Sequence, residues 1–133
     1  MIGRTYGLFL LLTILAACAG SQEKKPKPTG IIIDGVTIRN QLAYPVRDVQ
    51  LLVPATGNFV GCGLIMARSD CATEFPGRDY FANAAVITWI ERDQPQTTGE
   101  FKITNPGDLV PGKSTRLEII IFNQGQAGAQ LIQ

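Results

Sequence analysis

The sequence predicts an all-β domain, an antiparallel β-sandwich of about seven strands, over residues 31–133. Short runs rich in β-branched and aromatic residues recur at intervals of 8–14 residues. Glycine, proline and asparagine stand between these runs, as they do in turns. No stretch after residue 30 keeps apolar residues at helical spacing over three turns without a glycine or proline. These three observations together favour a sandwich over any helical fold.

The expected strands can be read in order along the chain. The seven β-prone segments are 31–38, 48–53, 58–66, 85–90, 98–103, 117–122 and 127–132. Asp34-Gly35 interrupts the first and predicts a bend or bulge there. Val49, Leu51 and Val53 alternate with other residues, which is typical of a half-buried strand.

The segment 85–90 is apolar at nearly every position, so we expect a central strand covered on both faces. Turns are expected between the segments, at 40–45, 54–57, 74–78, 105–112 and 123–125. Trp89, the only tryptophan, lies in segment 85–90. It is either a core residue, which this position favours, or a platform for a sugar or a partner.

The N-terminus has the parts of a secretory signal. Arg4 precedes an apolar run over 8–17, which is about half of the roughly 20 residues needed to span a membrane. The run ends in Leu15-Ala16-Ala17-Cys18. This tetrad resembles the lipobox of bacterial lipoproteins. The other interpretations are an ordinary secretory signal with a chance cysteine, or a buried hydrophobic helix.

The lipoprotein resemblance implies a cellular location and a lipid modification. It implies that Cys18 carries a diacylglyceryl group, that residues 1–17 are cleaved, and that the new N-terminus is acylated. Several acyl chains together hold a protein to a membrane far more firmly than one. Ala19, rather than aspartate, follows the cysteine. By the same resemblance this favours the outer membrane, with the domain facing the periplasm.

Residues 18–30 are expected to be the lipidated cysteine and a flexible tether. The segment is almost free of apolar residues and contains two prolines, which favour an extended polyproline conformation. At about 3.1 Å per residue it would hold the domain up to roughly 35–40 Å from the bilayer. Its lysines either touch anionic head groups or are merely solvated.

The charge balance argues against nucleic-acid binding. The whole chain has 12 basic and 11 acidic residues, and no basic stripe that could neutralise a phosphate backbone. Two cysteines, Cys62 and Cys71, remain besides Cys18, and in an oxidising envelope they are expected to form a disulfide as a local staple. Free thiols or metal ligation are the alternative, but the chain has no histidine to complete a zinc site.

Catalysis is not expected. Without histidine no ordinary base can activate the serines beyond the signal. The scattered carboxylates are interpreted as solvated turn residues rather than an acid–base pair or a calcium site; they are Asp70, Glu74, Asp79, Glu91 and Asp93. We therefore expect no enzyme activity, no cofactor, no metal and no small-molecule substrate.

One loop is a candidate partner-binding site. Phe75, Arg78, Tyr80 and Phe81 lie close together beside the expected disulfide. Aromatic residues and arginine dominate interface energetics, and a rigid loop loses less entropy on binding. These side chains should then be substantially exposed. The alternative is that one or two of the aromatics plug the end of the sandwich.

Two short patterns resemble immunoglobulin-like and fibronectin-like bacterial envelope domains. One is Pro111-Gly112-Lys113-Ser114, followed by a strand and a turn at 123–127; the other is Ile38-Arg39-Asn40 followed by 46–49. They imply an immunoglobulin-like sandwich. The combined expectation is a lipid-anchored binding or accessory module of the envelope, whose partner is an envelope protein or polymer. The alternative is a structural spacer or assembly component without a discrete site.

Overall fold

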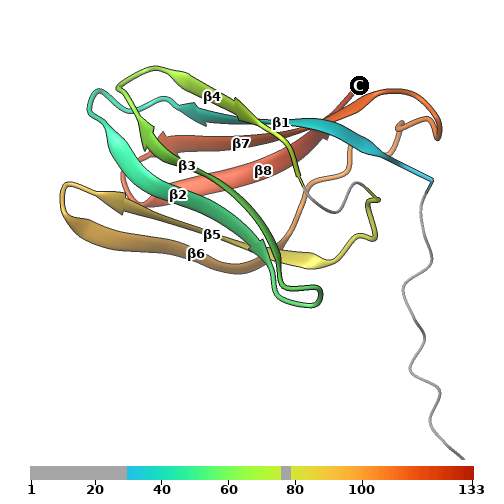
Figure 1. The fold of residues 1–133 in the computed structure, drawn as a ribbon, viewed down its shortest axis with the longest axis horizontal. Helices are drawn as coiled ribbons and strands as arrows, with labels where there is room; N and C mark the ends of the chain where they lie inside the picture. Colours follow the sequence, from blue (N-terminus) through green and yellow to red (C-terminus); the bar gives the residue numbers. More distant parts are fainter. Residues whose placement is uncertain (1–29, 76–78) are drawn as a thin grey trace, which may run out of the picture.

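The computed structural model describes residues 30–75 and 79–133. The predicted signal peptide, Cys18, the tether up to residue 29, and Arg78 of the candidate loop lie outside the described residues. Within them the chain forms eight strands and no helix (Figure 1). They are β1 (Ile33–Asn40), β2 (Val46–Val53), β3 (Asn58–Ile65), β4 (Asp70–Thr73), β5 (Ala84–Glu91), β6 (Gln94–Lys102), β7 (Thr115–Asn123) and β8 (Gln126–Ile132). No helix among the described residues is long and apolar enough to cross a membrane.

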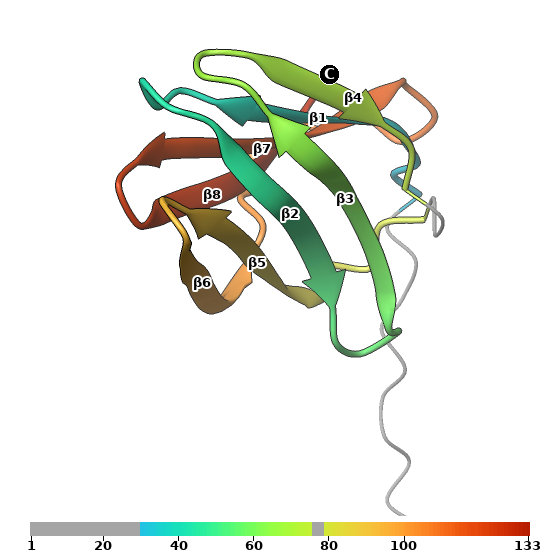
Figure 2. The ribbon, with the colours of Figure 1, turned by 60° about the vertical axis from the view of Figure 1, so that its left-hand side comes forward.

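The strands form two four-stranded sheets that face each other (Figures 1 and 2). Sheet 1 has the order β4-β1-β7-β8, and sheet 2 has the order β3-β2-β5-β6. The all-β sandwich is therefore confirmed. The expectation of a wholly antiparallel arrangement was wrong for one pair, because β1 and β7 run parallel. The strand count also exceeds the expected seven, since β4 was not anticipated.

The sequence did not predict β4, because a strand of only four residues is too short to show an alternation of apolar and polar residues. It forms because it pairs with β1, with Cys71 opposite Ile38. β1 itself has an irregular register between Ile33 and Gly35, as the Asp34-Gly35 interruption predicted. A second irregularity in β2 falls between Arg47 and Gln50, where Asp48 has a positive φ of 51°.

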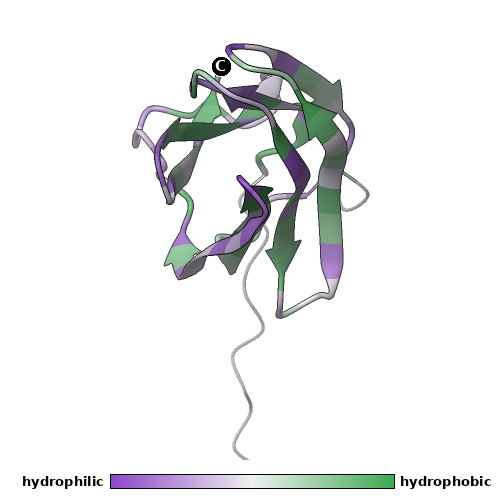
Figure 3. Cartoon of the chain, turned by 90° about the vertical axis from the view of Figure 1, so that its left-hand side faces the viewer, coloured by the Kyte–Doolittle hydropathy of each residue, from purple (hydrophilic) through white to green (hydrophobic). Residues whose placement is uncertain are grey.

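The core lies between the sheets and is built by alternation along each strand. The largest fully buried side chains come from both sheets: Trp89, Ile38, Leu51, Ile65, Ile87, Leu117, Ile119, Ile121, Val36, Val46, Val49 and Asn40. Figure 3 shows strongly hydrophobic segments in both layers. The core position expected for Trp89 is confirmed, since only 1% of the residue is exposed.

The expectation that β5 is covered on both faces was wrong. Ala85, Ile87 and Trp89 face the core, whereas Thr88 is exposed and Val86 is only half-buried. β5 is central in sheet 2, but in the described part of the chain no layer packs on the outer face of that sheet. Sheets of antiparallel sandwiches commonly have one solvated face, so apolar residues on both sides of a strand do not prove double coverage.

The β5–β6 hairpin begins earlier than expected. Arg92 and Asp93 both have positive φ and form a two-residue connection, so β6 starts at Gln94 instead of residue 98. Arg-Asp lacks the Asn-Gly signature of such turns, which is why the sequence did not reveal it. Pro95 is tolerated because β6 is an edge strand.

The expected Cys62–Cys71 disulfide is present, with 6.6 Å between the Cα atoms. It was expected to act as a local staple, but it joins the edge strand β3 of sheet 2 to the edge strand β4 of sheet 1. A bond between cysteines nine positions apart therefore links the two layers directly. On the chain-entropy model a loop of this length contributes about 3 kcal/mol to stability.

Candidate functional site

An apolar pocket opens between the sheets at the end of the sandwich where β1 and β7 begin. We call this end the tether end after the tether predicted for residues 18–30, because the described part of the chain begins here at residue 30 (Figure 1). The cavity has a volume of about 100 Å³. It is lined by Ile33, Leu51, Val53, Thr56, Asn58, Phe75, Asp79, Tyr80, Phe81, Asn83, Ile103 and Leu117.

Strands from both sheets supply the floor of the pocket. Ile33 stands at the start of β1, Leu117 near the start of β7, and Leu51 near the end of β2. All three are almost completely buried. Their positions follow from the period of two, which turns them toward the opposing sheet.

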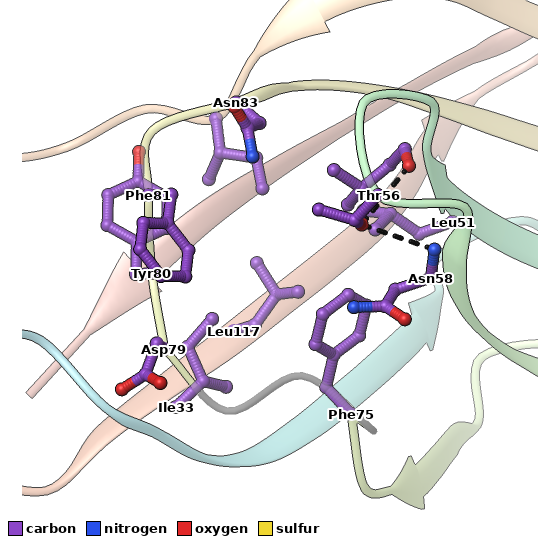
Figure 4. Close-up of a pocket in the computed structure, with 12 residues that line it drawn as sticks. Ile33, Leu51, Thr56, Asn58, Phe75, Asp79, Tyr80, Phe81, Asn83 and Leu117 are labelled. Atoms are coloured by element: carbon purple, nitrogen blue, oxygen red, sulfur yellow. Dashed lines mark hydrogen bonds between the residues drawn. The ribbon is translucent and has the colours of Figure 1, made fainter. Parts of the chain in front are cut away.

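The walls come from the segment after residue 78 and from Phe75. The backbone N–H of Tyr80 donates to the carbonyl oxygen of Ile31 at 3.0 Å, so this segment is held against the chain that enters β1. Figure 4 shows Tyr80 and Phe81 on one side of the pocket and Phe75 on the other. Ala82, next to Phe81, has a positive φ of 57°, a conformation that costs an L-residue about 1 kcal/mol.

The expectation that Phe75, Tyr80 and Phe81 are substantially exposed was wrong for Tyr80. Only 7% of Tyr80 is exposed, and burial raises the pKa of its phenol above the ordinary value. Phe75 and Phe81 are half-buried. The three aromatic side chains line an inter-sheet pocket rather than projecting from a loop.

The rim of the pocket is polar. Thr56, Asn58, Asp79 and Asn83 surround the apolar interior (Figure 4). The Thr56 hydroxyl accepts a hydrogen bond from the backbone N–H of Asn58 at 3.2 Å. Among the lining residues only Asp79 carries a charge, and it is exposed. A polar rim around an apolar interior is typical of a site that receives an apolar group.

The size of the cavity limits what can enter it. Sites for small molecules and cofactors usually have about 300–1,000 Å³, and a buried cavity of about 150 Å³ holds one benzene ring. A cavity of about 100 Å³ therefore suits one branched aliphatic side chain or a short piece of hydrocarbon. Within residues 30–75 and 79–133 no three or more histidine, cysteine or acidic residues are grouped to hold a metal ion.

At the opposite end, which we call the far end, Glu91 is 2% exposed. The expectation that it is a solvated turn residue was wrong. Its carboxylate accepts hydrogen bonds from the Tyr44 hydroxyl at 2.6 Å and from the backbone N–H of Gly125 at 2.9 Å. The bond from Tyr44 to Glu91 is the main cause of the raised pKa of Tyr44, whose ring also stacks against Arg92. Glu91 thereby ties β5 of sheet 2 to the β7–β8 turn of sheet 1.

Asn40 is a second buried polar residue at the far end, although the sequence predicted only a turn and a short hairpin pattern at this position. It is 0% exposed. Its side-chain amide donates to the carbonyl oxygens of Tyr44, Ile65 and Met66, and its side-chain oxygen accepts from the N–H of Leu42. Asparagine is so common in turns that its presence alone gives no signal of this role.

No family model and no curated protein matches the sequence. A solved structure described as the NMR structure of a protein from Eubacterium rectale is similar over 80% of this chain and 92% of that chain, with 17% sequence identity and a TM-score of 0.46.

Proposed function

We propose that this protein is a lipid-anchored, non-catalytic binding module of the bacterial cell envelope. Its binding site is the pocket at the tether end, and the ligand is an apolar side chain presented by an envelope protein. The observation that carries the proposal is the aromatic-lined cavity between the sheets, which has a polar rim and a leucine-sized volume.

The pocket has the chemistry of an interface hot spot. Hot spots are well-packed, desolvated pockets filled by an anchor from the partner and ringed by groups that exclude water. The half-buried Phe75 and Phe81 can still gain contacts when a guest enters. Their ordering on binding costs little entropy, because aromatic side chains have few rotatable bonds.

The proposed location of the module in the envelope rests on the N-terminal residues. Leu15-Ala16-Ala17-Cys18 ends a short apolar run, and a polar, proline-containing segment follows up to residue 30. A lipid anchor with such a tether would leave the domain in the aqueous periplasm, and that compartment is oxidising enough to maintain the disulfide.

The anchor is tested by replacing Cys18 with serine. We expect Cys18→Ser to abolish incorporation of labelled fatty acid and to move the protein from the membrane fraction to the soluble envelope fraction. Serine lacks the thiol that forms the thioether, and no other acylation site is proposed. Cys62→Ser is the matched control and should leave acylation unchanged. Continued labelling of the Cys18→Ser protein would contradict the anchor.

The pocket is tested by site-specific photo-crosslinking of the acylated protein in its own cells. A benzophenone amino acid at Thr56, on the pocket rim, should give a defined adduct with one envelope protein. The same label at Gln124, at the far end, should not. Filling the pocket by Val53→Phe, at a half-buried lining residue, should abolish the adduct at Thr56, with circular dichroism used to check that the sandwich is intact.

Two results would contradict the binding role. One is equal adduct formation from positions 56 and 124; the other is an adduct at 56 that persists unchanged in a folded Val53→Phe protein. Neither result bears on the acylation of Cys18, so the lipid anchor and the binding site are tested separately.

A further inference from the structure

The four edge strands of the sandwich are protected to very different degrees. An exposed edge presents unpaired backbone N–H and C=O groups, and natural proteins shield such edges with short strands, charges, prolines, irregularities or a covering segment. β4 has only four residues. The edge of β8 is partly covered, because the N–H of Thr104 donates to Ala129 and the N–H of Leu131 donates to Thr104.

The edge of β6 carries several of these devices together. Pro95 removes one donor, and a register shift in the β5–β6 pairing and a positive-φ Gly99 interrupt the strand. Glu100 and Lys102 add charge near its end.

β3 has fewer of these protections: Cys62 is bonded to Cys71 of β4, and the carbonyl oxygen of Ile65 accepts a hydrogen bond from the Asn40 side chain at the end of the strand. It is eight residues long, Asn58–Ile65, and contains neither a charged residue nor proline. In the described part of the chain β2 is the only strand that pairs with it, so the other edge of β3 has no strand partner (Figure 2). A long, neutral edge of this kind is a template for another β-strand.

β3 also carries two large, exposed apolar side chains. Phe59 is 56% exposed and Leu64 is 61% exposed. Gly61 and Gly63 lie between them, and a Cβ added at Gly63 would meet no atom within 4 Å. The strand therefore offers two large apolar side chains next to positions that have none.

We propose that β3 is a strand-pairing site and that it pairs antiparallel with β3 of a second copy of this protein. The strand is complementary to itself. In the register that places Gly61 on the two-fold axis, Phe59 of each copy faces Gly63 of the other, and an aromatic ring that covers a cross-strand glycine is a known stabilising arrangement. Because β3 is uncharged, the pairing meets no like-charge repulsion. A two-fold axis makes the contact isologous, so assembly stops at the dimer.

The test measures the oligomeric state of the full-length acylated protein in detergent micelles by sedimentation equilibrium. The expected result is a reversible monomer–dimer equilibrium. Phe59→Lys places an ammonium group in both symmetric Phe59–Gly63 contacts and should raise the dimer dissociation constant about tenfold or more. Phe122→Lys, at a comparably exposed aromatic on sheet 1, should leave the constant unchanged.

Amide hydrogen exchange supplies a second readout. Backbone N–H groups on the open edge of β3 should exchange more slowly as the protein concentration rises, whereas those on the edge of β6 should not. Leu64→Lys serves as a further variant if Phe59→Lys lowers the folded fraction. A protein that stays monomeric at all concentrations, or a dimer equally sensitive to Phe122→Lys and Phe59→Lys, would overturn the proposal.

Discussion

Replacing Trp89 by alanine is expected to lower the free energy of unfolding by about 3–5 kcal/mol. Trp89 is 1% exposed and is the largest of the fully buried side chains. Alanine would remove its apolar contacts and leave a cavity that two opposed sheets cannot close. The change should be measured by urea unfolding followed by circular dichroism, because Trp89 is the only tryptophan. All variants should be compared in one unacylated Cys18→Ser background.

A conservative variant separates packing from hydrogen bonding. The indole Nε1–H of Trp89 is buried and has no hydrogen-bond partner among the described residues. Trp89→Phe would therefore keep much of the apolar volume and lose no hydrogen bond, so we expect it to cost less than Trp89→Ala. Phe122→Ala, at an exposed aromatic, should change stability by no more than about 0.5 kcal/mol. A loss below about 1 kcal/mol for Trp89→Ala would contradict the position of Trp89 in the core.

Replacing Asn40 by alanine is expected to lower the free energy of unfolding by about 3 kcal/mol. The buried amide of Asn40 donates to Tyr44 at 2.9 Å, Met66 at 3.1 Å and Ile65 at 3.3 Å, and its oxygen accepts from Leu42 at 3.0 Å. Alanine would remove the Asn40 partner of two buried backbone groups, the carbonyl of Ile65 and the N–H of Leu42, and each buried group left unsatisfied costs about 1–3 kcal/mol.

Asn40→Asp should be at least as damaging as Asn40→Ala at neutral pH. A carboxylate keeps an acceptor for the N–H of Leu42 but turns its second oxygen toward three carbonyl oxygens. Asn123→Ala is the matched control, because the side-chain oxygen of Asn123 accepts an exposed hydrogen bond from the backbone N–H of Gln124. The free energies of unfolding of the Asn40→Ala, Asn40→Asp and Asn123→Ala proteins should be measured by chemical denaturation. A loss for Asn40→Ala no greater than that for Asn123→Ala would show that the Asn40 network contributes little.

The two ends of the sandwich differ in how they are held together. At the far end Asn40 connects the end of β1 to the end of β3, and Glu91 connects β5 to the β7–β8 turn. Both connections join sheet 1 to sheet 2 through buried polar groups. The tether end instead contains the cavity. Regions with fewer buried contacts open more easily, and binding sites are commonly found there.

The sequence predicted most strands because alternation and turn residues are local properties. Val49, Leu51 and Trp89 were assigned from their immediate neighbours, and the structure places all three in the core. Glu91 could not be assigned in this way. A carboxylate beside a turn is normally solvated, and its burial depends on Tyr44 and Gly125, which are 47 and 34 positions away.

The burial of the aromatic residues in the candidate loop could not be predicted from the sequence either. Composition singled out Phe75, Tyr80 and Phe81 as a cluster, and the structure brings them together around one cavity. Their burial was not visible in the sequence, because an aromatic-rich segment can equally well project from an end or close it. In the structure the backbone hydrogen bond from Tyr80 to Ile31 and the bridge between Ile32 and Asp79 hold the segment against the chain that enters β1.

The amino-acid sequence by itself determined the all-β class, the turns at 54–57 and 123–125 and the irregularity near Asp34-Gly35, and together with the lipoprotein resemblance it predicted the pairing of Cys62 with Cys71. These depend on interactions between residues close along the chain. Only the tertiary structure decided which strands share a sheet, that β1 and β7 run parallel, that Asn40 and Glu91 are buried, and that among the described strands β3 pairs with β2 alone. Strand pairing and polar burial join residues far apart in sequence, and local patterning carries no information about which distant segment will supply the partner.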